Sequence, residues 1–275
     1  MNFLVIIFME AVIIALISGA LSGSLGVILY RMNLLTISFT TAHAALAGAA
    51  LSLIIGTNPE LTAFIFSLLV ALLVEALYEK IGINREMISM ALFSFSSALS
   101  MFAIFMTPTV TLTSEVASLV LWGSVLAVTP AKILLMLLVF IGFILYISAF
   151  KFEIDSILFD YKLAEAEGVN VSMHAIILIL VTSISISLIL KLTGAFLTFS
   201  LLFNPSMSAI KLSHKRQAFI GGVLGGISGS LGVVLSFILD SPIGATIALT
   251  SSIILLFATV SAEIYEYHVR KRIIQ

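Results

Sequence analysis

Long apolar runs, each long enough for a membrane-crossing helix and separated by short polar breaks, fill the chain from one end to the other. A helix needs about 20 mostly apolar residues to cross a bilayer, because every backbone polar group in hydrocarbon must be hydrogen-bonded within the segment. The alternating pattern of a membrane β-barrel is absent, so the runs predict helices. We expect nine spans, with eight as the alternative, at about 8–30, 37–56, 60–79, 87–106, 130–150, 172–190, 194–212, 217–239 and 243–263.

Two further stretches complete this prediction of an all-α, polytopic integral membrane protein. Residues 115–129, EVASLVLWGSVLAVT, are too few to span comfortably, and we expect a re-entrant or interfacial helix with Trp122 at the lipid headgroups. The N-terminal residues MNFLVIIFMEA place Glu10 inside an apolar run that has no basic region before it. We expect them to belong to the first span and not to a cleaved signal peptide.

Composition excludes most other classes of protein. Of 275 residues, 61% are hydrophobic and 10% are charged, whereas a soluble domain has about 45–50% apolar and about 25% charged residues. Together with a mean hydropathy of +1.24, this excludes a water-soluble enzyme, a disordered protein and a nucleic-acid binder. The absence of cysteine excludes disulfides, thiolate metal sites and thiol nucleophiles.

The placement of the basic residues predicts an orientation. Eleven of the thirteen fall on one side of the expected topology, and only Lys132 and Lys191 fall on the other. Because cytoplasmic loops carry the excess of Lys and Arg, the side with eleven is expected to be cytoplasmic, with the C-terminus inside and the N-terminus outside. The eleven are Arg31, Lys80, Arg85, Lys151, Lys162, Lys211, Lys215, Arg216, Arg270, Lys271 and Arg272.

Small residues recur at three- and four-residue spacing in GGVLGGISGSLG, residues 221–232. Such spacing predicts a close approach of helix backbones, since small residues form the contact surface where lipid supplies no hydrophobic drive. A similar string occurs twice, as SGSLGVILY at 22–30 and SGSLGVVLS at 228–236. A shared packing constraint is the favoured interpretation, with gene duplication as the alternative, because the surrounding sequence does not repeat.

The longest polar segment is the cytoplasmic loop at about 151–171, KFEIDSILFDYKLAEAEGVNV. Its LAEAEG stretch is expected to form a short amphipathic helix closed by Gly168. The loop is either a solvated connector or a docking helix for a cytoplasmic partner, since long ordered loops in compact proteins are usually functional.

Five segments, in one order along the chain, carry a resemblance to a known family. They are GVILYRMNLL (26–35), HAALAG (43–48), FDYKLAEAEGVNV (159–171), LKLTGAFLTFSLLFNP (190–205) and SFILDSPIGATIAL (236–249). This set resembles the permeases of metal-ion ABC transporters, the importers of zinc, manganese or iron.

The resemblance implies a single permease domain over 1–275 of the type II-like importer architecture, in a prokaryotic cytoplasmic membrane. It implies a homodimer with two cytoplasmic ATPase subunits and an extracytoplasmic metal-binding protein, importing a divalent metal by alternating access. The chain contains no P-loop motif, so ATP hydrolysis is expected on another subunit. Residues 159–168 would couple to the ATPase, through Phe159, Asp160, Leu163, Ala164, Glu165 and Gly168.

The second helix carries the candidate substrate site. The family has an Asp four residues before a His, and carboxylate and imidazole at that spacing share one helix face and suit divalent transition metals. Here the His is His43, the candidate metal ligand, but Phe39 stands in the Asp position. The missing carboxylate leaves open a transient site, another ligand set or another substrate, such as a metal chelate.

Other polar residues complete the candidate pathway. Ser38 and Thr40 lie near His43, Glu10 is an intramembrane acid, and Asn204 either bonds carbonyls freed at Pro205 or lines the pathway. The remaining polar groups are expected at interfaces: an ion-pair cluster of Glu75 and Glu79 near Lys80, and solvated histidines at His174, His214 and His268.

Two other classes of function fit the sequence less well than a permease. An ion-coupled secondary transporter is expected to show paired acids or broken helices at the bilayer midplane, and this chain has few such acids. An intramembrane protease needs a nucleophile with a base or a metal cage, and neither H-E-x-x-H nor G-x-S-x-G occurs.

Overall fold

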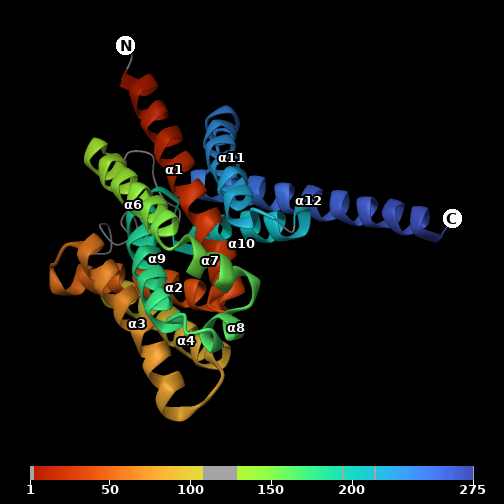
Figure 1. The fold of residues 1–275 in the computed structure, drawn as a ribbon. Helices are drawn as coiled ribbons and strands as arrows, with labels where there is room; N and C mark the ends of the chain where they lie inside the picture. Colours follow the sequence, from red (N-terminus) through yellow and green to blue (C-terminus); the bar gives the residue numbers. More distant parts are fainter. Residues whose placement is uncertain (1–2, 108–128, 194, 214, 275) are drawn as a thin grey trace.

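The computed structural model describes residues 3–107, 129–193, 195–213 and 215–274, and within these ranges the chain forms helices and no strand (Figure 1). The helices are α1 (Phe3–Arg31), α2 (Leu35–Ile55), α3 (Pro59–Ile81), α4 (Arg85–Met106), α6 (Pro130–Ala149), α7 (Lys151–Phe159), α8 (Tyr161–Ala166), α9 (Val171–Thr193), α10 (Ala195–Leu212), α11 (Gln217–Leu239) and α12 (Ile243–Ile274).

The predicted spans correspond to these helices, and the protein is an all-helical, multi-pass membrane protein. Within the described ranges, eight helices are long and apolar enough to cross a membrane. The ninth predicted span is α10, which lies outside those eight and carries Asn204 and Pro205 in its interior. The short helix predicted at 115–129, with Trp122, falls almost entirely outside the described residues.

Tight connections join α2, α3 and α4. Gly56 and Gly82 follow α2 and α3 with φ of 74° and 69°, a left-handed conformation that a residue without Cβ adopts at no steric cost. Asn58 and Asn84 then cap the next helices, since their side-chain oxygens accept hydrogen bonds from first-turn amides. These signals fix the ends of three successive spans.

The second helix, α2, forms the centre of the bundle and packs against α3, α4, α9 and α10. Its alanines and Gly48 allow this crowding, because a Cβ added at Gly48 would lie 2.4 Å from the carbonyl oxygen of Thr62 on α3. The helix that carries His43 is therefore held on several sides.

The α1–α11 pair shows the backbone approach that the small residues predicted. A Cβ on Gly225 would lie 2.0 Å from the oxygen of Gly19, and one on Gly23 would lie 2.0 Å from the oxygen of Gly221. The two similar strings at 22–30 and 228–236 thus belong to helices that pack on each other. That contact favours the shared packing constraint over duplication.

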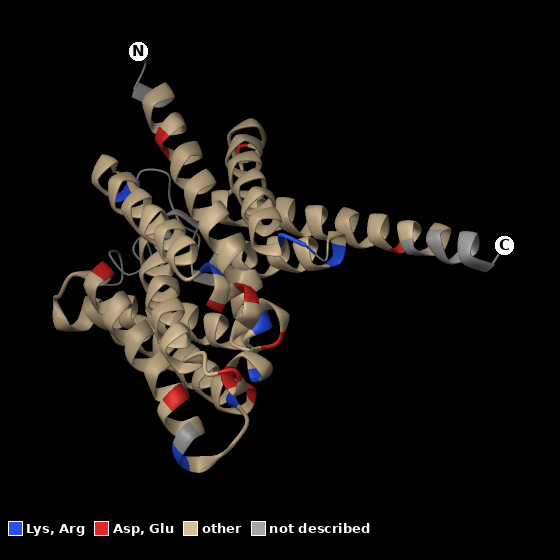
Figure 2. Ribbon diagram, viewed as in Figure 1, with Lys and Arg blue, Asp and Glu red and all other residues tan. Residues whose placement is uncertain are grey.

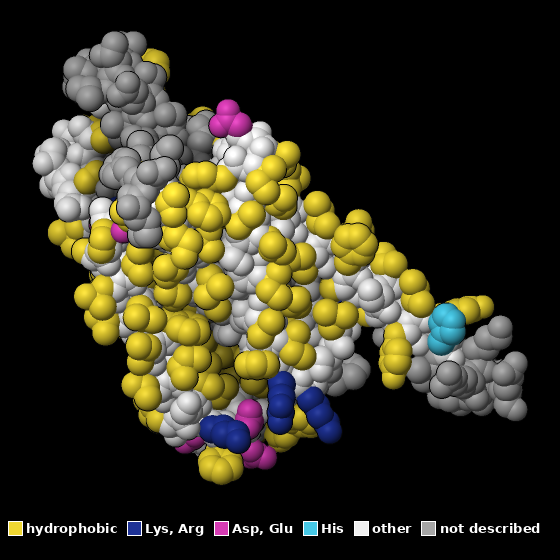
Figure 3. Space-filling view, turned by 90° about the horizontal axis from the view of Figure 1, so that it is seen from above, with side chains coloured by type: hydrophobic (Ala, Val, Ile, Leu, Met, Phe, Trp, Pro, Cys, Tyr) yellow, Lys and Arg dark blue, Asp and Glu magenta, His cyan; other side chains and the backbone are white. Residues whose placement is uncertain are grey.

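Charged residues gather at helix ends and connections, and the helix middles are nearly free of them (Figure 2). Arg85 pairs with Glu75 at 3.0 Å and stacks over the Tyr78 ring, so Arg85 is the partner of Glu75 in the ion-pair cluster predicted near Lys80; the side chain of Glu79 is not described. Hydrophobic side chains cover much of the face in Figure 3, with Lys and Arg at one edge.

The last helix, α12, extends away from the bundle (Figure 1). Large apolar side chains from its middle outward are exposed, among them Phe257 and Ile264. In a single copy of the chain, this part of α12 has few protein neighbours.

Candidate substrate pathway and coupling segment

His43 lies in the interior, between α2 and α4. Only 5% of the residue is exposed. Its Nδ1 is hydrogen-bonded to Ser97 Oγ at 2.9 Å, and the ring contacts Phe93 edge to face with centroids 4.4 Å apart. The fourth helix thus fixes the imidazole orientation.

The hydroxyls near His43 are buried and bonded to the backbone. Thr40 Oγ1 donates to the carbonyl oxygen of Ser89 on α4 at 2.8 Å, and Ser38 Oγ donates to Leu35 within α2 at 2.5 Å. Each oxygen still has lone pairs, so both remain possible acceptors for a passing cation.

Phe39 occupies the position of the missing carboxylate and joins a cluster of three phenylalanines. Its ring centroid lies 4.6 Å from that of Phe199 and 6.2 Å from that of Phe203, both on α10. The α10 side of α2 at this point is therefore an aromatic surface.

A cavity of about 210 Å³ adjoins this cluster, and Phe39 and Phe203 form part of its wall. Asn33, Thr36 and Glu86 line the same cavity. Glu86 is an acid that the sequence analysis did not select. It stands in the first turn of α4, where an acidic residue is explained by the helix dipole alone, so the sequence held no separate signal for it.

The other two pathway candidates lie on different helices. Glu10 is on the N-terminal part of α1, partly exposed, and α1 packs mainly on α11, α10 and α6. Asn204 is buried, and its Nδ2 donates to Ser251 Oγ at 2.9 Å and Ser252 Oγ at 3.0 Å. Asn204 thus connects α10 to α12 through its amide group.

His43 is the candidate metal ligand, and the described residues place no full cage around it. Among them, no three His, Asp or Glu side chains come together in a group that suits a metal ion. One imidazole with neighbouring hydroxyls fits a passing cation better than a resident one, since tight sites use three or four strong ligands.

The charged loop at 151–171 folds into two short helices, α7 and α8. Asp160 caps α8, accepting hydrogen bonds from the amides of Lys162 at 2.8 Å and Leu163 at 3.2 Å. The predicted LAEAEG helix is confirmed, and Gly168, with φ of 92°, follows its end.

A pair of backbone hydrogen bonds closes α8. The amide of Val169 donates to the oxygen of Ala164 at 3.0 Å, and that of Gly168 donates to Glu165 at 3.1 Å. This is the Schellman arrangement, which explains why a glycine stands at 168.

The coupling candidates divide into a buried base and an exposed face. Ala164 is fully buried, together with Ile154 and Ile157 of α7, so the pair of helices is anchored in the bundle. Phe159 is 79% exposed, and Leu163 and Glu165 are exposed as well. An apolar and acidic face thus projects from a rigid base.

One buried polar pair contradicts the sequence analysis. The prediction that His174 is solvated is wrong, because the residue is 1% exposed and is hydrogen-bonded through Nδ1 to the Tyr146 hydroxyl. Phe150 contacts the His174 ring edge to face, with centroids 5.4 Å apart. The pair joins α6 to α9, the helices on either side of α7 and α8.

The other two histidines that were expected at the surface differ in outcome. His268 is exposed as predicted, and His214 lies outside the described residues.

Comparisons with known proteins agree with this architecture. The manganese import system permease protein ScaB of Streptococcus gordonii is 28% identical over 265 residues, which cover 95% of this chain and 94% of that protein. The high-affinity zinc uptake system membrane protein ZnuB of Buchnera aphidicola subsp. Schizaphis graminum is 27% identical, over 87% of this chain and 92% of its own.

A solved structure has the same fold. PsaBC from Streptococcus pneumoniae in complex with Fab superposes with a TM-score of 0.77 at 23% identity, covering 91% of this chain and 90% of that chain. The model of the ABC 3 transport family matches residues 1–262. With a match over nearly the whole length, the chain belongs to the ABC 3 transport family.

Proposed function

We propose that this chain is the membrane-spanning permease subunit of an ABC importer that moves a divalent transition metal ion, manganese or zinc, into the cell. The observation that carries the proposal is the family match over residues 1–262. The names of the relatives, a manganese import permease and a zinc uptake membrane protein, supply the class of substrate.

ATP hydrolysis takes place on a separate cytoplasmic subunit that docks on α7 and α8. The exposed face of Phe159, Leu163 and Glu165 supports this assignment, because an aromatic anchor with an apolar neighbour is typical of a docking hot spot. The buried base at Ala164 and Ile157 then transmits the movement of the ATPase to α6 and α9 as a rigid body.

The substrate passes along α2, and access alternates between the two sides of the membrane. His43 with Ser38 and Thr40 receives the ion, Phe39 and its aromatic neighbours form a narrow apolar barrier, and Glu86 attracts the cation beyond that barrier. Support comes from the order of these residues, since the cavity with Glu86 begins where the aromatic cluster ends.

The end that carries Arg85 and Glu86 faces the cytoplasm, and so does the C-terminus. The excess of Lys and Arg at that end of the topology supports this orientation. The opposite end carries the ion pair of Lys132 with Glu60 at 3.0 Å, and an extracytoplasmic metal-binding protein delivers the ion there.

Proteoliposomes test the proposal. The chain, reconstituted with its ATPase and binding protein, is expected to accumulate manganese or zinc only when ATP is supplied on the ATPase side. Uptake by the chain alone, without an ATPase, would overturn it.

A variant pair tests the pathway. His43→Ala is expected to lower uptake about tenfold or more while ATPase binding stays unchanged, because even the loss of a residue that only supports a metal ligand costs about 10–100-fold in metal affinity. His268→Ala, in the exposed end of α12, is the matched control. Unchanged uptake in His43→Ala would remove His43 from the pathway.

A further inference from the structure

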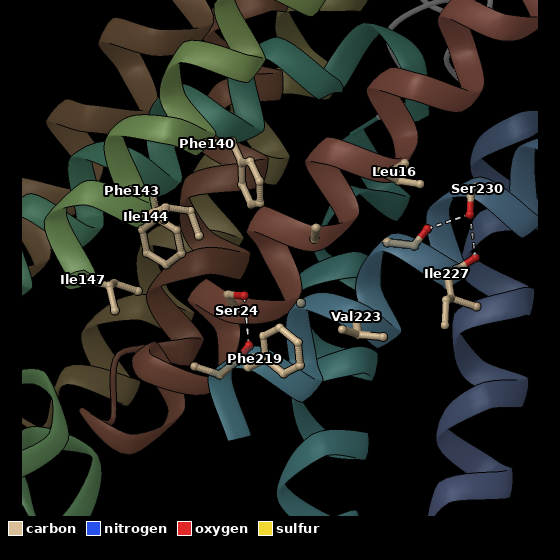
Figure 4. A pocket seen from close by; sticks show the side chains of 14 residues that line it. Leu16, Ser24, Phe140, Phe143, Ile144, Ile147, Phe219, Val223, Ile227 and Ser230 are labelled. Carbon is tan, nitrogen blue, oxygen red and sulfur yellow. Dashed lines mark hydrogen bonds between the residues drawn. The ribbon is translucent and has the colours of Figure 1, made fainter. Parts of the chain in front are cut away.

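An apolar groove of about 490 Å³ runs along the outside of the bundle, between α1, α6 and α11 (Figure 4). Leu16 and Ala20 line it from α1, Phe140 and Ile144 from α6, and Val223 and Ile227 from α11. All three helices are candidate membrane spans, so the groove lies at the depth of the hydrocarbon.

The groove offers no free polar group to a ligand. Its two hydroxyls already donate to main-chain oxygens, Ser24 to Ala218 at 2.9 Å and Ser230 to Gly226 at 2.8 Å (Figure 4). None of the unpaired buried side-chain atoms in the described part of the chain lines it. A long saturated chain satisfies such walls, whereas water or a polar solute does not.

A basic residue stands near the end of each wall, on the side predicted to be cytoplasmic. Arg31 lies two turns beyond Ser24 on α1, Lys151 lies four residues after Ile147 of α6, as the first residue of α7, and Arg216 lies two residues before Ala218 of α11. Lys151 and Arg216 are exposed, and Arg31 keeps a guanidinium nitrogen beyond the two that bond Gln217. The acids near this end, Glu153 and Asp155 on α7, offset only part of that charge.

We propose that the groove is a binding site for an anionic phospholipid. One acyl chain lies between α1, α6 and α11, and the headgroup phosphate meets Arg31, Lys151 and Arg216. Apolar walls below a cytoplasmic cluster of basic residues are the two features that an anionic lipid requires. A second copy of the permease is the competing occupant, but α12, the helix that projects from the bundle, contributes no residue to the groove. This inference concerns the surroundings of the transporter and does not depend on the substrate.

Lipid retention measured by native mass spectrometry tests the site. The full chain with its co-purifying subunits is equilibrated with vesicles of equal parts phosphatidylglycerol and phosphatidylcholine, then extracted in mild detergent. The wild-type protein is expected to retain more phosphatidylglycerol than phosphatidylcholine. Val223→Trp, which fills the groove from an exposed position on α11, is expected to lose one lipid per permease chain, and Ile238→Trp, exposed on the same helix outside the groove, is expected to keep it.

Charge variants test the headgroup contact separately. Lys151→Gln and Arg216→Gln are each expected to reduce the preference for phosphatidylglycerol about fivefold at low salt, since a basic residue near the surface contributes about a factor of five to binding of anionic lipid. Lys80→Gln, on α3 away from the groove, is the control and is expected to change nothing.

Three results would overturn the proposal: unchanged lipid retention in Val223→Trp, equal retention of the two lipids by wild type, or cross-linking of two copies through a single cysteine at Ile227→Cys. The last would place a second copy over the groove. If Val223→Trp fails to assemble, Ile144→Trp fills the groove from the opposite wall, and the charge variants decide the headgroup contact independently.

Discussion

Individual polar side chains connect the helices of this bundle. Thr40 bonds the backbone of α4, Asn204 bonds two serines of α12, and Tyr146 bonds His174 across α6 and α9. In lipid, such bonds fix which helix faces which, because the apolar side chains of two helices gain little by leaving hydrocarbon for each other.

The contribution of the Tyr146–His174 hydrogen bond to the free energy of unfolding can be measured. Tyr146→Phe and His174→Leu are each expected to lower the free energy of unfolding by about 1–3 kcal/mol, because each leaves one buried polar group without its partner. The double variant is expected to lose less than the sum, since both polar groups are then gone. Denaturation of the purified protein in one detergent measures all four members of the cycle, and strictly additive losses would contradict the coupling.

The elements themselves were largely readable in the sequence. Apolar length located the spans, and Gly168 marked a helix end at which the backbone turns left-handed; Gly56 and Gly82 mark two further such ends in the structure. The partner of each helix was less readable. The glycine pattern at 221–232 indicated a close contact but did not identify α1 as its partner. The contacts between glycines of the two helices in the structure established that partner.

The α1–α11 contact predicts a sharp difference between glycines. Gly225→Ala is expected to lower stability by about 1–3 kcal/mol, because the added Cβ would lie 2.0 Å from the oxygen of Gly19 and must push the two backbones apart. Gly142→Ala on α6 has open space around it and is expected to be neutral or slightly stabilising. Thermal unfolding followed by circular dichroism compares the two, and equal melting temperatures would contradict the close packing.

The cap of α8 gives a prediction for coupling. Asp160→Ala is expected to destabilise α8 by about 1 kcal/mol and to lower ATP-driven uptake, because the amides of Lys162 and Leu163 lose their acceptor. Asp160→Asn preserves the cap and should retain most of the uptake, while Asp155→Ala on α7 controls for charge. If Asp160→Asn is as defective as Asp160→Ala, the carboxylate acts through its charge on the partner and not as a cap.

At the scale of the whole molecule, the outer part of α12 projects from the bundle and exposes apolar side chains. Lipid can cover an apolar helix. This part of α12, however, makes few contacts with the other helices of its own chain, so it has a free surface for a protein partner. We expect a second copy to pack there, as in the homodimer that the family resemblance implies.

Cysteine cross-linking tests that expectation directly, because the natural chain has no cysteine. A single cysteine at Phe257→Cys on α12 is expected to give a covalent dimer with a short bismaleimide in membranes. Leu69→Cys, at an exposed apolar position on α3, is the control and is expected to remain monomeric on a denaturing gel. Cross-linking of equal yield at both positions would indicate random collision in the membrane.

The sequence by itself determined the class of fold, the approximate spans and a short helix over LAEAEG that Gly168 closes, because apolar length and helix-ending residues act locally along the chain. It also indicated that His43 and the charged loop are unusual. Only the tertiary structure decided the pairing of α1 with α11, the burial of His174 and the place of Glu86 beside Phe39. Those facts depend on which helices pack against each other. That packing is determined by contacts between residues far apart in the sequence.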